Sequence, residues 1–170
     1  MSPTKSQVAP RPRRIPRPHP KCEGMGAEEL AGWLRVAPEL GWLLTQLRRM
    51  GCSDASEAEV ISRVVQRMLA TAVLGADVPS LHCHLLAALA HVLEACPELG
   101  APEIARASGL TAGLMTLAPG PRALLVGADI EQLPLDALAS ALGMPSEVTP
   151  AVLMEARRVL MGVIKDHAPG

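Results

Sequence analysis

Apolar residues recur every three to four positions along most of the chain, which is the period of helices with one buried face. Ser56 and Glu59 have the spacing of a capping box and precede the most regular stretch of this pattern. We therefore predict a central helix that begins near Ser53–Ser56 and ends before Gly75 and Pro79. The apolar positions of this helix are Val60, Ile61, Val64, Val65, Met68, Leu69 and Ala72.

The same period predicts several further helices. Ser80 and Thr149 have the chemistry of N-caps for two of them, and Pro150 follows Thr149 at the first helical position. Ala118–Pro121 reads as a turn, and Leu124–Val126 is too short to support a sheet. The expected helices are Ala27–Val36, Leu40–Met50, Leu81–Ala95, Pro102–Ser108, Ala112–Leu117, Leu133–Leu142 and a last helix from Thr149 to about Lys165.

These patterns predict an all-α fold, either a compact multi-helix bundle or stacked helical hairpins, in one domain over residues 25–168. A short internal similarity favours stacked hairpins as one of the two alternatives. Residues 30–41 and 89–100 match at seven of twelve positions, including a shared Pro-Glu-Leu-Gly. Chance in a chain rich in Ala and Leu is the other explanation.

Charge separates the first residues from the rest of the chain. Residues 1–22 hold six basic residues, six prolines and no acid, whereas the remainder has ten basic against seventeen acidic residues, a formal charge of −7. Proline disfavours helix, so residues 1–24 are expected to be a disordered, basic arm. Its arginines would bind nucleic acid or another acidic surface; a targeting or secretion segment and a passive tail are alternatives. These arginines are Arg11, Arg13, Arg14 and Arg17.

Aromatic side chains are almost absent, since the chain has two tryptophans and no Phe or Tyr. Apolar residues make up 49% of the chain and charged residues 19%, which suggests an apolar helical face that a partner protein covers. Tryptophan is enriched at binding hot spots, so the predicted anchors lie in the first two helices. They are Trp33, Trp42, Leu43 and Leu47, with a core position for both tryptophans as the alternative.

Residues 103–111 carry a second candidate feature. Ala105, Gly109 and the apolar Ile104 and Leu110 have the spacing of the first helix and turn of helix-turn-helix regulators, which this segment resembles. The resemblance covers residues 101–118 and implies DNA binding. The following helix, however, has no Arg, Lys, Asn or Gln to read bases, so a packed helical hairpin is the other interpretation.

Catalytic and metal signatures are missing from the sequence. The four cysteines form no C-x-x-C pair, and His91 and Glu94 are the one pair of possible ligands at helical spacing, so no metal and no cofactor is expected. No apolar run approaches the ~18 residues of a membrane span, and no signal peptide is visible, so a cytoplasmic location is expected.

The sequence therefore predicts a non-enzymatic helical adaptor, assembly or chaperone-like protein that binds a partner protein through an apolar helical face. Homo-oligomer formation is a further option. The alternative is a nucleic-acid-associated regulator that uses residues 101–118 and the basic arm.

Overall fold

The computed structural model describes residues 37–71, 77–100 and 109–166, and these residues form an all-α fold, as predicted. The arm of residues 1–24, Trp33 and the expected helices Ala27–Val36 and Pro102–Ser108 lie outside the described residues. The α-helices are α2 (Leu40–Arg49), α3 (Glu57–Ala70), α4 (Val78–Ala95), α5 (Leu110–Met115), α6 (Pro119–Leu125), α7 (Leu135–Leu142) and α8 (Thr149–Asp166). Short 3₁₀ turns form η2 (Ala37–Glu39) and η3 (Pro97–Leu99), and η5 (Val126–Ile130) is a π-helical turn.

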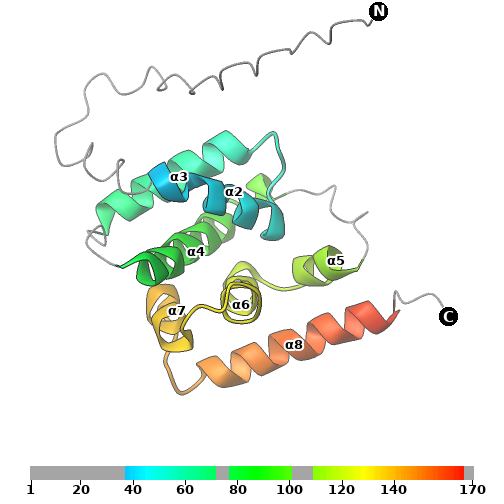
Figure 1. Cartoon of the computed structure of the whole chain (residues 1–170). Helices are drawn as coiled ribbons and strands as arrows, with labels where there is room; N and C mark the ends of the chain where they lie inside the picture. The colour runs from blue at the N-terminus through cyan, green and yellow to red at the C-terminus, as the bar shows by residue number, and fades with distance from the viewer. Residues whose placement is uncertain (1–36, 72–76, 101–108, 167–170) are drawn as a thin grey trace, which may run out of the picture.

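The helices are arranged around α4 (Figure 1). Helices α2 and α3 contact one side of α4, and α6 and α7 contact the other. Helix α8 lies beyond this second layer, where it packs on α5 and α6. One face of α8 is therefore left at the surface of the described part of the chain.

Helix α4 begins earlier than the sequence predicted. Asp77, and not Ser80, caps it, because the Asp77 carboxylate accepts the Ser80 backbone N–H at 3.0 Å. Pro79 lies in the first turn, where its missing N–H costs no intrahelical hydrogen bond, so it starts α4 instead of ending the preceding helix.

The resulting 18-residue α4 is a weak candidate for a membrane span, so the described residues contain no clear transmembrane segment. By length and composition alone α4 is long and apolar enough to cross a bilayer. Just over half of that stretch is buried inside the protein, against α3, α6 and α7. This burial accounts for its apolar character in the same way as for any central core helix.

Helix α3 begins near the predicted position but without the predicted capping box. The Ser56 backbone is already helical, and its side chain caps no N–H of α3. The Ser56 hydroxyl lies 2.7 Å from the Leu99 carbonyl oxygen, to which it donates. It therefore ties the start of α3 to η3, next to an isolated β-bridge between Cys52 and Gly100.

Helix α6 was not predicted, because its Pro-Gly-Pro start resembled a turn. Both prolines fall in its first turn, where proline is tolerated. The buried Arg122 side chain donates to the Met50 and Leu117 carbonyl oxygens at 2.5 and 2.6 Å. Arg122 thus fixes the start of α6 against the residues that follow α2.

The two similar sequence segments share a local turn. Pro-Glu pairs lie in η2 in the first copy and in η3 in the second. The chain then continues into α2 after the first turn, whereas the second turn leads to Gly100 and its bridge. Within the described residues the similarity is therefore limited to one turn.

Candidate functional site

Two of the predicted partner-binding residues are core residues in this structure. The side chains of Leu43 and Leu47 are 0% and 1% exposed. They face α4 from α2, so the expectation that they anchor a partner at the surface is corrected: in this conformation a partner does not reach them. The four arginines of the predicted acidic-surface site (Arg11, Arg13, Arg14 and Arg17) lie outside the described residues.

Trp42, the third predicted anchor, is half-buried and held by side chains of its own chain. Its indole stacks on the His82 imidazole with ring centroids 4.0 Å apart and planes within 1° of parallel. The indole N–H donates to the Glu131 carboxylate at 2.7 Å. These contacts join α2, α4 and the end of η5, so they point to a stabilising role.

The same carboxylate is the centre of a polar cluster that we call the Glu131 cluster: Trp42, Gln46, Arg49, His82 and Glu131. Arg49 forms an ion pair with Glu131. Burial raises the pKa of Glu131, but the hydrogen bonds from Trp42 and Arg49, together with the positive charge of Arg49, outweigh burial and lower it below its ordinary value. On the outer side of the cluster, His82 Nε2 lies 2.6 Å from a Glu39 carboxylate oxygen.

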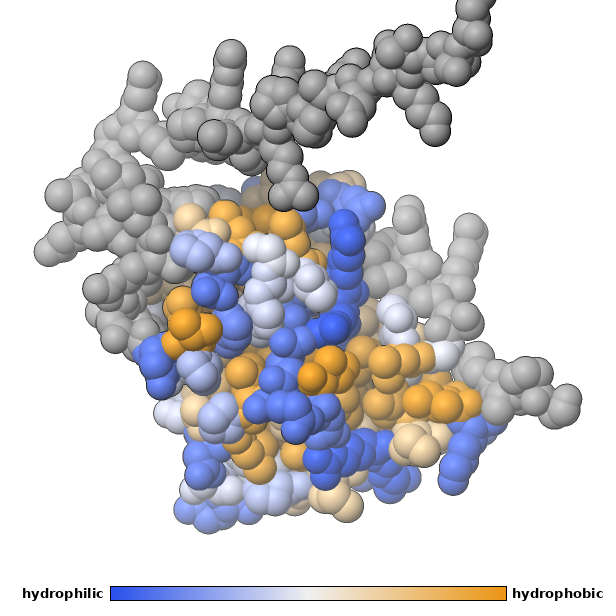
Figure 2. Space-filling model, viewed as in Figure 1, coloured by the Kyte–Doolittle hydropathy of each residue, from blue (hydrophilic) through white to orange (hydrophobic). Residues whose placement is uncertain are grey.

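Exposed large apolar residues occur on α8. Met154 and Met161 are 60% and 53% exposed. At 100° per residue, positions seven apart lie within about 20° of each other around the helix, so both methionines share one face. Figure 2 shows apolar side chains gathering over α5 and the neighbouring end of α8.

Basic side chains flank the two methionines. By the same helical angle, Arg157 lies on one side of them, and Arg158 and Lys165 lie on the other. We call these five residues (Met154, Arg157, Arg158, Met161 and Lys165) the Met154 ridge. Arg157 donates to Asp129 of η5, a contact that lowers the pKa of Asp129, and Arg158 pairs with Glu155 one turn earlier.

The buried residues of α8 lie on the face away from the Met154 ridge, so the ridge remains exposed to solvent. Leu153, Ala156 and Leu160 are buried against α5 and α6. A Cβ atom at Gly113 of α5 would lie 2.4 Å from Leu160 Cδ1, so this glycine permits the close approach of the two helices. The packing of α8 thus uses one face and leaves the Met154 ridge in solvent.

The Met154 ridge was not predicted from the sequence, although the spacing of its two methionines could have identified it. Met154 and Met161 are seven residues apart and fall on the side away from Leu153, Ala156 and Leu160. An apolar pair on the polar side of an otherwise amphipathic helix is the pattern that would have identified it.

The second half of the segment that resembles helix-turn-helix regulators is described by the structure. Helix α5 has six residues, and its Gly113 and Leu114 are buried. Its remaining residues include no Arg, Lys, Asn or Gln, the side chains that make bidentate contacts with base edges. As described, α5 is a short helix packed on α8.

The described cysteines are buried and form no disulfide. Burial raises the pKa of the Cys52 and Cys83 thiols to about 11, a shift that Arg122 partly offsets at Cys52. The neutral thiol therefore dominates at both positions near neutral pH, and a neutral thiol is a poor nucleophile. Within residues 37–71, 77–100 and 109–166, no three His, Cys, Asp or Glu side chains gather closely enough to hold a metal ion.

No protein family, no curated protein and no solved structure matches this chain.

Proposed function

We propose that this protein is a non-enzymatic helical adaptor or assembly protein that binds the amphipathic helix of a partner protein through the Met154 ridge. The single observation that carries the proposal is the exposure of Met154 and Met161 on one face of α8. Exposed apolar side chains gathered on one face are typical of protein-binding surfaces. Methionine suits such a surface because its flexible, polarisable side chain adapts to a partner.

Charge indicates the chemistry of the partner. The two methionines lie between Arg157 on one side and Arg158 and Lys165 on the other. Arg157 and Arg158 already pair with Asp129 and Glu155, so within the described residues Lys165 carries the positive charge that has no ion-pair partner. A helix with an apolar stripe bordered by Asp or Glu would place opposite charges beside these residues. We therefore expect an acidic, amphipathic helix to bind along α8.

The same charges disfavour a second copy of this chain as the occupant. In a two-fold antiparallel pairing of α8 with its copy, Met154 would face Met161, and the axis would pass between positions 157 and 158. Arg157 and Arg158 would then meet the arginines of the copy. Such a juxtaposition of like charges opposes association.

The alternative of a nucleic-acid-associated regulator rests on residues 1–22 and 101–108, which the structure does not describe. Helix α5 does not support this alternative, because it has no Arg, Lys, Asn or Gln to make bidentate contacts with bases. No observation favours this alternative over the adaptor, so it enters as a competing outcome of the test.

The test compares variants of the full-length chain in affinity capture from native cells. Replacing both methionines, Met154→Ser with Met161→Ser, removes the apolar stripe, and Lys165→Glu reverses one flanking charge. Val78→Ser is the matched control, because Val78 is also 53% exposed but lies at the start of α4. Circular dichroism and urea denaturation establish that each variant is folded.

We expect one protein to be recovered with the wild type and with Val78→Ser, at least tenfold less with the double variant, and less with Lys165→Glu. Its binding segment should be an acidic, amphipathic helix. Equal recovery with the double variant, a second copy of the chain as the recovered species, or nucleic acid in its place would overturn the proposal.

A further inference from the structure

A small cavity lies between α3, α4 and α7, on a different part of the molecule from the Met154 ridge. Its volume is about 80 Å³. The residues around it come from all three helices, and six of the eight matter here: Arg67, His84, Ala87, Ala88, His91 and Ala141. This volume is of the order of a few water molecules, which suits a small inorganic or carboxylate ion.

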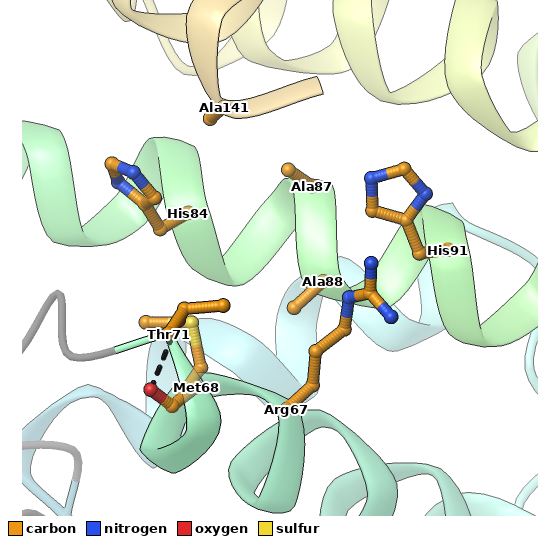
Figure 3. Close-up of a pocket in the computed structure, with 8 residues that line it drawn as sticks. All are labelled: Arg67, Met68, Thr71, His84, Ala87, Ala88, His91 and Ala141. Atoms are coloured by element: carbon orange, nitrogen blue, oxygen red, sulfur yellow. Dashed lines mark hydrogen bonds between the residues drawn. The ribbon is translucent and has the colours of Figure 1, made fainter. Parts of the chain in front are cut away.

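The cavity exists because alanines stand between larger side chains. His84 and His91 are seven residues apart on α4, so they rise from the same face two turns from each other. Ala87 and Ala88 lie between them, and Ala141 of α7 faces them across the gap (Figure 3). The two histidines thus stand at the two ends of a space with small apolar walls.

The polar groups around this space are mainly basic: three of the eight lining residues are Arg or His, and none is a carboxylate. Arg67 extends from α3 toward His91 (Figure 3). Arg67 is exposed, and within the described residues its guanidinium forms no ion pair. A negatively charged ligand would meet a guanidinium that donates no hydrogen bond to any described residue.

The hydrogen bond of His84 fixes which of its nitrogens is left for a ligand. Its Nδ1 lies 2.7 Å from the Ser80 carbonyl oxygen. A carbonyl oxygen only accepts, so Nδ1 carries the hydrogen and donates it. The remaining nitrogen, Nε2, becomes a second donor when the imidazole is protonated.

We infer that this cavity binds a small oxyanion, a phosphate or a carboxylate, between Arg67 and the imidazole of His91. Seven residues rise about 10.5 Å along an α-helix, so one small ion does not bridge both imidazoles, and His84 lies at the other end of the cavity. Arg67 supplies the permanent positive charge. Because the cavity walls are alanines, a larger side chain at Ala141 would fill the space without changing the charge.

Among the described residues, Glu94 is a further charged group near the cavity, one turn beyond His91 on α4. Its carboxylate lies 3.7 Å from His91 Nδ1. It does not line the cavity, and α7 contributes only Ala141 to the lining. Glu94 therefore opposes the anion at the His91 end.

The test is a titration of the full-length protein with inorganic phosphate, followed through the imidazole signals of His84 and His91 in proton–carbon NMR spectra. Sodium acetate and sodium chloride at matched ionic strength are titrated in parallel. Variants are Arg67→Gln, which removes the permanent charge, and Ala141→Leu, which fills the cavity. Arg48→Gln is the matched control, because Arg48 on α2 is also exposed and forms no ion pair within the described residues.

We expect saturable shifts of the His91 signals with phosphate or acetate, but not with chloride. Hydrogen bonds to charged groups are strong enough that Arg67→Gln should weaken binding roughly tenfold or more. Ala141→Leu should abolish the shifts and Arg48→Gln should leave them unchanged.

Saturation with phosphate alone would identify a phosphate site, and saturation with acetate would identify a carboxylate site. Shifts that do not saturate, that chloride reproduces, or that respond to Arg48→Gln as strongly as to Arg67→Gln would overturn the inference. Binding that persists in folded Ala141→Leu would also overturn it, because the ion would then lie outside the cavity.

Discussion

Trp42 illustrates how a single residue type is misread from sequence. Tryptophan is both a frequent interface anchor and a frequent structural residue, and the sequence does not distinguish the two. The structure surrounds Trp42 with an imidazole on its face and a carboxylate at its N–H. Neither His82 nor Glu131 is near Trp42 in sequence, so no local pattern identifies these contacts.

We expect Trp42→Ala to lower the free energy of unfolding by about 2 kcal/mol or more, since it removes the stacked ring and the hydrogen bond that the indole N–H donates to Glu131. Urea denaturation followed by circular dichroism measures this change. Trp42→Phe should lose less, because it keeps an aromatic face against His82. An unchanged unfolding midpoint in Trp42→Ala would instead indicate that Trp42 anchors a partner and does not stabilise the fold.

Glu131 gives a prediction about acid sensitivity. Its pKa is lower in the folded protein than in the unfolded chain, so on acidification the unfolded chain binds the proton first. The stability that Glu131 contributes is therefore complete at neutral pH and is lost as the pH falls through its folded pKa.

The free energy of unfolding of Glu131→Gln should thus differ from that of the wild type most at neutral pH, and the difference should shrink below about pH 4.3. Denaturation curves across this pH range measure it. Glu147→Gln is the control, because Glu147 is exposed and no contact of it is described. A difference that stays constant with pH would contradict the role assigned to the Glu131 carboxylate.

At the scale of helices, the period of apolar residues predicted the all-α class and the positions of α2, α3, α4, α5, α7 and α8 to within a few residues. The errors came from the residues at helix starts. Ser56 and Ser80 have side chains that often cap helices, yet Ser56 bonds to Leu99 and Asp77 caps α4. Pro119 looked like part of a turn, whereas in the structure it starts α6.

These errors share a physical cause. Whether a serine hydroxyl caps its own helix depends on which other acceptor lies nearby, and Leu99 is 43 residues from Ser56. The start of α6 likewise depends on Arg122 reaching the Met50 carbonyl across the fold. The predicted partner-binding site was wrong for the same reason. Leu43 and Leu47 are buried because they pack against α4, which is distant in the sequence.

Helix packing around η5 gives a prediction at this scale. A Cβ atom at Gly127 would lie 2.7 Å from both methyl carbons of Leu138 and 3.1 Å from Leu86, and both leucines are fully buried. Gly127→Ala should therefore force a shift in the packing of η5 with α4 and α7, at a cost of about 1–3 kcal/mol.

Gly162→Ala is the control for this substitution. Gly162 lies in α8, and a Cβ atom there meets nothing within 4 Å. Since alanine favours helix over glycine by about 1 kcal/mol, Gly162→Ala should raise the free energy of unfolding. Urea denaturation of both variants checks the pair; two substitutions with the same sign would contradict the packing described for Gly127.

At the scale of the whole molecule, the stabilising polar contacts and the exposed apolar surface lie on different parts of the described fold. The Glu131 cluster joins α2, α4 and η5 within the fold, whereas the Met154 ridge lies on the outer face of α8. The cavity of Arg67, His84 and His91 lies between α3, α4 and α7. A partner helix on α8 and an oxyanion in the cavity would therefore bind at separate places.

Site-specific photocrosslinking shows whether the Met154 ridge contacts a partner protein. A photoreactive benzophenone amino acid replaces Met161 in the full-length chain, and in a second variant it replaces the equally exposed Val78 on α4. After irradiation in native cells, we predict one adduct with another protein from position 161, joined through an acidic, amphipathic helix, and none with that protein from position 78. Three outcomes would contradict a partner-binding role of the Met154 ridge: adducts with that protein from both positions, an adduct with a second copy of this chain, or no protein adduct from position 161.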